Sequence, residues 1–412
     1  MNEQNKEHKF EYLKGDNVLW IAIITISIFS IFPVYSASSN LEYIVNTGTT
    51  TSHLLKHSFF VIIGLTVMRS VSFIKYHAIG KLSSILLLVC IALLVYTAFT
   101  GQTIDGASAS RWMKIPGTPI SFQPSTFAFL TLIIYLCRYL QKTIKKRKTP
   151  LENIFFIFVP ILVVFMLVAK DNGSTALMIL IVSIIVLVIG QLDWRYIAGF
   201  ISTSLVAGVL FILIALNTNL IGGNRVHTWM SRMETFTAAK TNASDIDSEA
   251  MKTKNYQVMQ AKAAIVHGGL SGQGPGKSAL KQMLPQSASD FIFAIIIEEY
   301  GLLGAGFLLF FYLLILYRTI IIANKIPHFF GSLLVLAMGV MIFVQLAVNI
   351  AVAVNLIPVT GQPLPLISYG GTSMLVTYIQ LGLILSVSSQ IQIYDEEGIG
   401  KKQSIDEIND IA

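Results

Sequence analysis

The chain has 412 residues, of which 54% are hydrophobic and only 12% are charged, and its formal net charge is +7. Soluble domains carry roughly 25% charged residues, so this composition, with a mean hydropathy of +0.68, excludes an ordinary soluble protein. Much of the basic excess lies in the run 138–148, directly after an apolar segment. Such a cluster sets topology and contacts anionic lipid. We therefore predict a membrane protein that contacts lipids and binds no nucleic acid.

Ten apolar runs are long enough to cross a membrane as helices, which takes roughly 20 residues each. The runs lie at about 18–38, 55–74, 82–100, 122–140, 154–169, 175–190, 196–216, 290–317, 330–354 and 369–393. Only residues 170–174 separate the fifth run from the sixth, and we interpret this pair as a hairpin rather than one helix. The sequence thus predicts an all-α polytopic integral membrane protein, with residues 1–412 forming a single domain.

The basic residues predict the orientation, because Lys and Arg in short loops stay on the cytoplasmic side. If the N-terminus is inside, most of them fall in inner loops, and the short outer loops hold only Lys56, Arg111, Lys114 and Lys170. We therefore predict that the tails 1–15 and 394–412 are cytoplasmic. The polar loop 217–289, between the seventh and eighth helices, is then extracytoplasmic.

Acidic residues mark the end of that polar loop. Asp290 opens the apolar run 290–317, and an ionisable group at the membrane edge is a candidate functional residue because its burial is costly. The alternative is a carboxylate that only caps the helix start. Glu298 lies about two turns further on nearly the same helix face, so we expect it to line the same cavity. Glu299 points away, which favours a structural partner.

Glycines and lysines precede Asp290 in the loop. The segment 268–276 holds five glycines, which allow close approach of its backbone to a ligand or the membrane surface. It has one residue too few for a phosphate loop of the Gly-Lys-Ser type. Lys277 and Lys281 add positive charge, which suits a pyrophosphate or a lipid head group; a plain turn with solvated lysines is the alternative.

Two further outer loops carry polar candidates. Asp171 lies in the turn 170–174, where it is either a turn residue or a site residue. Arg111 beside Trp112 is either an interface anchor or a bidentate phosphate contact.

The last outer segment, 355–373, contains three prolines and three glycines. Such a sequence cannot continue a helix, and non-helical backbone at membrane depth occurs where it is buried in protein or lines a wet cavity. We expect this segment, which includes Ser368, to form a wall of the site.

Part of this segment, Pro-Leu-Pro-Leu-Ile-Ser-Tyr-Gly-Gly-Thr-Ser at 363–373, resembles the signature of the SEDS family, which includes FtsW, RodA and SpoVE. Further blocks resemble the family in its order: 34–38, 109–112, 123–125, 171–174, 256–257, Gln260, 268–269, 284–285, 289–294 and 298–301. The blocks 34–38 and 286–291 look most like the division branch, FtsW, with RodA as the near alternative.

The resemblance implies a peptidoglycan glycosyltransferase that joins lipid II units into glycan strands, with inversion and release of undecaprenyl pyrophosphate, in septal wall synthesis. Such a reaction needs a base and positive charge on the leaving group. Carried over to this sequence, the family pattern makes Asp290 the catalytic residue. The implied substrate-binding residues are Arg111, Arg232, Lys277, Lys281, Glu298, Asp171 and Ser368.

The resemblance also implies partners and a place. The expected partners are a class B penicillin-binding protein transpeptidase and other division proteins, in the bacterial cytoplasmic membrane at the septum. No cofactor is certain; a divalent cation, Mg or Mn, is considered, although no metal-ligand spacing is present. Thr126 and Phe129 replace a Glu and a Lys that are usual in the family, so no role is assigned there.

Two other classes of function stay open. A bundle with acidic residues at membrane level also fits a transporter that flips lipid II, although the sequence shows no inverted repeat and its charges gather at the outer face rather than the midplane. A non-enzymatic scaffold for division proteins is the third reading, and it requires no intact acid.

Overall fold

The structure, a computed structural model, describes residues 14–43, 49–100, 112–114, 121–146, 154–217, 236–237, 249–280 and 288–397. Three of the predicted substrate-binding residues, Arg111, Arg232 and Lys281, lie outside the described residues.

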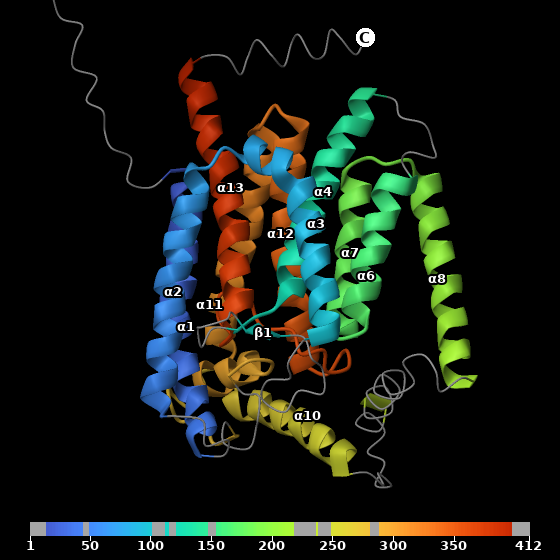
Figure 1. The fold of residues 1–412 in the computed structure, drawn as a ribbon. Coiled ribbons are helices and arrows are strands. Elements are labelled where there is room, and N and C mark those ends of the chain that lie inside the picture. The colour runs from blue at the N-terminus through green and yellow to red at the C-terminus, as the bar shows by residue number, and fades with distance from the viewer. Residues whose placement is uncertain are drawn as a thin grey trace, which may run out of the picture.

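Upright helices form a bundle, and one further helix lies across its end (Figure 1). The upright helices are α1 (Asn17–Tyr43), α2 (Thr50–Phe73), α3 (Tyr76–Thr100), α4 (Pro124–Lys146), α6 (Val159–Ala169), α7 (Gly173–Ile189), α8 (Trp194–Asn217), α11 (Ile292–Lys325), α12 (Phe329–Ala353) and α13 (Gly371–Glu397). A π-helical turn, η1 (Ile154–Phe158), precedes α6, and the helix across the end is α10 (Glu249–Gly268). The strands β1 (Met113–Lys114) and β2 (Ser121–Phe122) pair antiparallel before α4.

Length and composition support the membrane assignment. Among the described residues, six helices are long and apolar enough to cross a membrane, namely α1, α2, α3, α11, α12 and α13, and two shorter apolar helices cover 155–169 and 173–189. The prediction of an all-α multi-pass membrane protein is confirmed.

Close helix packing at small residues joins α2 to α13. A Cβ added to Gly64 of α2 would lie 2.0 Å from the ring of Tyr378 of α13, and one added to Gly382 would lie 2.8 Å from the carbonyl of Met68. Helices in membranes associate largely through such packing, since lipid supplies little hydrophobic drive between them. Glycine is therefore required at both positions for α2 and α13 to approach this closely.

The fifth and sixth predicted helices form two packed antiparallel helices, α6 and α7, as a hairpin requires (Figure 1). The turn between them ends with Asn172, whose Oδ1 accepts a hydrogen bond of 3.2 Å from the Thr175 amide at the first turn of α7. This side-chain cap explains why the chain starts a new helix here.

The helix after the polar loop was predicted as one continuous run, but the structure shows a break in it. Within α11, Gly301 has φ 68° and ψ −170°, so the helix is broken there. The part from 302 to 325 extends about 36 Å at about 1.5 Å per residue, which is enough to cross a bilayer core of about 30 Å. The half from 292 to 300 is therefore not needed to cross the membrane and is available to build the outer surface.

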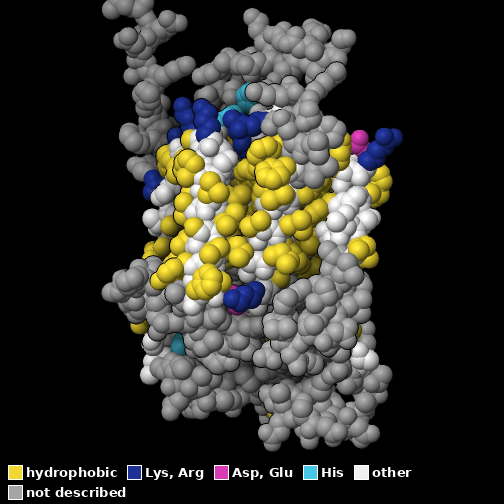
Figure 2. All heavy atoms as spheres, turned by 45° about the vertical axis from the view of Figure 1, so that its right-hand side comes forward, with side chains coloured by type: hydrophobic (Ala, Val, Ile, Leu, Met, Phe, Trp, Pro, Cys, Tyr) yellow, Lys and Arg dark blue, Asp and Glu magenta, His cyan; other side chains and the backbone are white. Residues whose placement is uncertain are grey.

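Basic side chains gather along one edge of the hydrophobic band (Figure 2). At this end of the bundle lie the connection from α2 to α3 with Lys75, the C-terminal end of α4 and the C-terminal end of α11 with Lys325. The opposite end carries α10 and the connection from α12 to α13 (Figure 1). This is the distribution expected when the basic edge is cytoplasmic and α10 is extracytoplasmic.

Candidate active site

Asp290 lies in a turn directly before α11, and its residue is 8% exposed. The last outer loop passes beside the Asp290 carboxylate. A Cβ added to Gly361 of this loop would lie 3.5 Å from Asp290 Oδ2. Gly361 has φ +70°, a backbone conformation that favours glycine. The segment predicted to form a wall of the site therefore lies beside the Asp290 carboxylate, and its role as a wall of the substrate site stays a prediction.

Three consecutive main-chain carbonyls hold the turn at Asp290. The Ala288 carbonyl accepts 2.9 Å from the Tyr369 amide, and the Ser289 carbonyl accepts 2.6 Å from the Ser368 hydroxyl. The Asp290 carbonyl accepts 3.1 Å from the side-chain amide of Asn349 in α12. Bonds on each of three successive residues leave the turn little freedom, so the backbone that carries the Asp290 side chain is fixed.

Side chains from the neighbouring helices support the last loop in turn. Gln345 Nε2 donates 3.0 Å to the Pro363 carbonyl, and the Tyr312 hydroxyl donates to the Pro365 carbonyl. Gln362 Nε2 donates 2.9 Å to Thr175 Oγ1 in the first turn of α7. Irregular backbone at membrane depth must have its polar groups satisfied by protein, and α7, α11 and α12 are the partners in these three hydrogen bonds.

Ser368 is 3% exposed, and its hydroxyl has two protein partners. It donates to the Ser289 carbonyl and accepts 2.7 Å from the Leu364 amide. The structure thus shows Ser368 as a link between the last loop and the turn at Asp290. A direct contact of Ser368 with substrate stays a prediction.

Glu298 is fully buried and bonds to the segment that follows the glycines. Its carboxylate accepts from the Ser278 hydroxyl, from the Ala279 amide at 3.1 Å and from the Leu280 amide at 3.3 Å. The carboxylate therefore holds this segment against α11, and its predicted contact with substrate stays a prediction. The neighbouring Glu299 faces another part of the fold, as predicted, and accepts from the Ser36 hydroxyl of α1.

The glycine-rich segment fills the break in α11 with main-chain hydrogen bonds. Before the break, the carbonyls of Glu298 and Glu299 accept from the amides of 273 and 274, each at 2.9 Å. After it, the amides of 302 and 303 donate to the carbonyls of 269 and 270, at 3.0 and 3.1 Å. Groups that a continuous helix would pair internally are thus paired with the loop.

Two of these contacts admit no side chain. A Cβ on Gly272 would lie 2.3 Å from the Glu299 carbonyl oxygen, and a Cβ on Gly268 would lie 2.0 Å from the Ile297 carbonyl oxygen. The sequence predicted close approach of these glycines to a ligand or to the membrane surface. At Gly268 and Gly272 that interpretation is wrong, because the group they approach is the main chain of α11.

Lys277 is exposed and follows this segment directly. Its amide donates 3.1 Å to the Gly274 carbonyl, and its neighbour Ser278 is bonded to Glu298. The lysine is therefore carried by a segment that is fixed to the same half-helix, 292–300, that follows Asp290. Among the predicted pyrophosphate contacts, Lys277 is the one that lies within the described residues.

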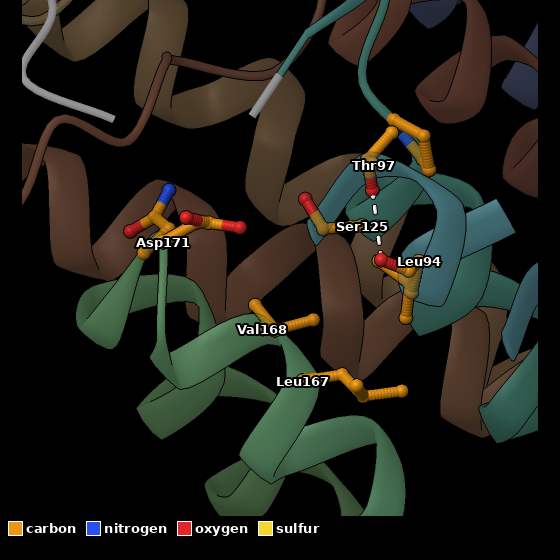
Figure 3. A pocket seen from close by; sticks show the side chains of 8 residues that line it. Leu94, Thr97, Ser125, Leu167, Val168 and Asp171 are labelled. Atoms are coloured by element: carbon orange, nitrogen blue, oxygen red, sulfur yellow. Dashed lines mark hydrogen bonds between the residues drawn. The ribbon is translucent and has the colours of Figure 1, made fainter. Parts of the chain in front are cut away.

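Asp171 lines a small pocket at the turn between α6 and α7, opposite Thr97 of α3 and Ser125 of α4 (Figure 3). Asp290 does not line this pocket. The link between the two places runs through Asn172, Thr175 and Gln362. The substrate contact predicted for Asp171 is thus not brought directly against Asp290 and stays a prediction.

Two amides, Gln345 and Asn349, were not predicted as part of the site, because both lie in an apolar run that reads only as a membrane helix. A signal was present: they are four residues apart, which places them on one face of α12. Polar groups within a membrane helix face protein rather than lipid. Two amides on one face therefore indicate a polar neighbour, which here is the last loop.

Comparison with known proteins gives the family. The model of the family of FtsW, RodA and SpoVE, described as "Cell cycle protein", matches residues 16–393. A relative from Hydrogenovibrio crunogenus, named probable peptidoglycan glycosyltransferase FtsW, is 30% identical over 86% of this chain and 88% of its own. The peptidoglycan glycosyltransferase MrdB of Escherichia coli K12 is 26% identical over 93% of this chain and 96% of its own.

Solved structures share the fold. A chain from a study of "structural coordination of polymerization and crosslinking by a peptidoglycan synthase complex" matches with a TM-score of 0.67 and 23% identity, over 92% of this chain and 98% of that one. The rod shape determining protein RodA of Thermus thermophilus matches with a TM-score of 0.62 and 22% identity, over 91% of this chain and 96% of that one. With the family model covering nearly its whole length, this chain belongs to the FtsW, RodA and SpoVE family of cell cycle proteins.

Proposed function

We propose that this protein is a peptidoglycan glycosyltransferase that polymerises lipid II at the outer face of the membrane. One observation carries the proposal: the carboxylate of Asp290 lies at the outer end of the bundle, beside an irregular loop, in a turn whose three successive carbonyls, 288 to 290, all accept hydrogen bonds. The names of the relatives supply the reaction, since three of them are called probable peptidoglycan glycosyltransferase.

The chemistry requires a base at this position. Asp290 takes the proton of the acceptor sugar hydroxyl as the oxygen of that hydroxyl forms a bond to the anomeric carbon of the donor. The bond from that carbon to the pyrophosphate breaks on the opposite side, and the electron pair leaves with undecaprenyl pyrophosphate. The configuration at the anomeric carbon is inverted, and the proton stays on the Asp290 carboxyl until it is released to water.

The leaving group gains negative charge as this bond breaks, so fixed positive charge near it lowers the barrier. Lys277 is exposed on the segment that Glu298 holds, and we assign it to the pyrophosphate. Arg111, Arg232 and Lys281 are proposed for the same role from the sequence.

A divalent cation is proposed only as a further positive charge that would stabilise the leaving pyrophosphate. Among the described residues, no group of three or more His, Cys, Asp and Glu side chains gathers in one place. No step of the proposed reaction depends on a cation.

We further infer a septal role with a class B penicillin-binding protein as partner. The FtsW relatives match at 30% and 29% identity and the MrdB relative at 26%, which favours the division branch. The study in which one related fold was solved concerns polymerisation and crosslinking in one complex, which supports a transpeptidase partner. Depletion in the native cell should block septation and give filaments; rounded cells that still divide would instead support the RodA role.

Glycan synthesis in vitro tests the enzymatic proposal. The purified protein, with its transpeptidase, is incubated with labelled lipid II, and products are separated on a gel. We expect glycan ladders from the parent protein and none from Asp290→Asn, which changes the shape of the side chain little. Asp193→Asn is the matched control, because Asp193 accepts the Arg195 amide at the start of α8 and lies at the basic end.

The other functions give different results. Lipid II that moves across liposome membranes without ladders would support a flippase. A parent protein with neither activity, whose Asp290→Asn variant still supports division, would support a scaffold.

A further inference from the structure

We propose that Asn349 is a positioning residue for the reaction; this proposal rests on the proposed function of Asp290. Its side-chain amide joins the turn that carries Asp290 to the loop segment that borders the Asp290 carboxylate. It acts through these two backbones and does not contact substrate.

The geometry of the amide supports this role. Asn349 is fully buried near the outer end of α12. Its Nδ2 donates 3.1 Å to the Asp290 carbonyl and 2.8 Å to the Gln362 carbonyl. An amide nitrogen has two hydrogens, so each carbonyl receives one. A single rigid group thus sets the spacing between two segments that are far apart in sequence.

Both partners of the amide border the carboxylate. The Asp290 carbonyl belongs to the same residue as the carboxylate, and Gln362 follows Gly361, whose added Cβ would lie 3.5 Å from Asp290 Oδ2. A shift of either segment therefore changes the space around Oδ2. Misplacement of a reacting group by about 1 Å can lower a rate by about 100-fold.

The bonds continue beyond Asn349 and anchor it to the rigid part of the bundle. Gln362 uses its own side chain to donate 2.9 Å to Thr175 Oγ1 in α7. The path from Thr175 through Gln362 and Asn349 to Asp290 therefore joins two membrane helices, α7 and α12, to the catalytic turn.

The oxygen of the same amide behaves differently from its nitrogen. Asn349 Oδ1 is buried and has no hydrogen-bond partner within the described part of the chain. The two donated bonds are therefore what an apolar replacement of similar size removes, and the carbonyls of Asp290 and Gln362 lose their partner.

Steady-state kinetics of lipid II polymerisation test the proposal, with full-length protein and its transpeptidase. Asn349→Leu is close in size and removes both donors. We expect kcat to fall about 100-fold, the effect of a base about 1 Å out of place. KM should stay within about threefold, because an interaction made only through the position of the base affects the transition state rather than substrate binding.

Gln380→Leu is the matched control. Gln380 is also a buried amide in a membrane helix, 3% exposed, and its Nε2 donates to Met341 Sδ at 3.8 Å. Neither the turn at Asp290 nor the last loop is among its hydrogen-bond partners within the described residues. We expect Gln380→Leu to keep the parent kcat and KM.

Asn349→Asp is the second variant if Asn349→Leu is not recovered folded, because it keeps the volume, and its carboxyl, when protonated, donates one hydrogen bond in place of two. It should lower kcat about tenfold with KM unchanged, as loss of about half of the positioning interaction implies.

Two outcomes overturn the role of Asn349. One is a parent-like kcat in the folded Asn349 variant, and the other is a joint change of kcat and KM that Gln380→Leu reproduces. A parent protein that makes no glycan refutes the proposed function instead, so the two failures are distinguishable.

Discussion

Two outer segments contact the N-terminal half of α11, and they do so by different chemistry. The last loop, 355–370, reaches the turn at Asp290 with help from side chains, those of Ser368 and Asn349. The glycine-rich segment, 268–280, reaches the break at Gly301 mainly through its main chain, with glycines where the backbones are closest. A side-chain bond can be removed by one substitution that adds no atoms, whereas the main-chain contact is broken only by adding atoms.

This difference predicts two kinds of variant. Substitutions in the support of Asp290 should lower the rate of each folded molecule, whether or not they also lower the stability. Substitutions at the glycines should change the stability, while the molecules that still fold keep the parent rate.

Gly272→Ala should give the largest loss of stability. Its Cβ would lie 2.3 Å from the Glu299 carbonyl oxygen, and the residue has φ +79°. Overlap with backbone and an unfavourable φ together should lower the free energy of unfolding by about 3 kcal/mol or more. Denaturation of the detergent-solubilised protein by SDS measures this change.

Gly276→Ala is the control for Gly272→Ala. Gly276 has a similar φ of +75°, but a Cβ there would meet nothing within 4 Å. It should cost only about 1 kcal/mol, the expected cost of the backbone conformation alone. Equal losses in the two variants would show that the contact with α11 contributes nothing.

Glu298→Gln should give the next largest loss of stability. The amide keeps one oxygen acceptor but places an NH2 group against the donors of segment 278–280, whose amides of Ala279 and Leu280 now bond to the carboxylate. Loss of hydrogen bonds to a buried charged group costs about 1.5–3 kcal/mol. Hydrogen exchange at those two amides should speed up.

The neighbouring carboxylate provides the comparison for Glu298. Glu299→Gln changes a side chain that accepts from Ser36 in α1, so exchange at 279 and 280 should stay as in the parent. If both variants speed exchange equally, Glu298 does not hold the segment specifically.

The sequence predicted the membrane helices and the place of the last loop, because hydropathy and proline content are local signals. It did not predict the break in α11 at Gly301, since Phe291–Leu303 reads as one apolar run with two acidic residues. It also missed α10, whose buried Ala261 and Ala264 acquire their partners only when the helix packs on α11. Breaks and pairings of this kind depend on groups that are distant in sequence.

The same reason explains the mixed result for the site. Asp290 could be singled out as a candidate because a carboxylate beside an apolar run is visible locally, and its catalytic role stays a prediction. The bond of Glu298 to Ser278 and the bond of Asn349 to Asp290 join separate elements, and no pattern within one helix shows them.

Ser368→Ala should lower both stability and rate by smaller amounts. It removes the donor to the Ser289 carbonyl and the acceptor of the Leu364 amide, which should cost about 1 kcal/mol for each hydrogen bond. Because Ser289 precedes the base, kcat should also fall about tenfold, which is less than the effect of about 1 Å of misplacement. Unfolding by SDS and polymerisation kinetics measure the two effects.

Ser386→Ala separates these two effects. Ser386 is a buried serine of α13 that donates 2.5 Å to the Ile74 carbonyl at the basic end of the bundle. It should lose about 1 kcal/mol of stability, for its one hydrogen bond, and keep the parent kcat. A fall of kcat in Ser386→Ala equal to that in Ser368→Ala would attribute both to general loosening.

Lys277→Gln should have the smallest effect and is the exception within the glycine-rich segment, because it tests binding rather than stability. An exposed positive charge near the pyrophosphate should lower KM. Salt should weaken that contribution, since at 0.1 M mobile ions largely screen exposed charges that lie more than about 10 Å apart. We expect KM to rise about threefold at low salt. The difference from the parent should vanish near 1 M salt, where the screening length is only about 3 Å. Lys262→Gln, an exposed lysine of α10, should leave KM unchanged. If the two lysine variants raise KM equally, the effect belongs to the net charge of the outer surface, and the segment 268–280 then serves only to hold α11.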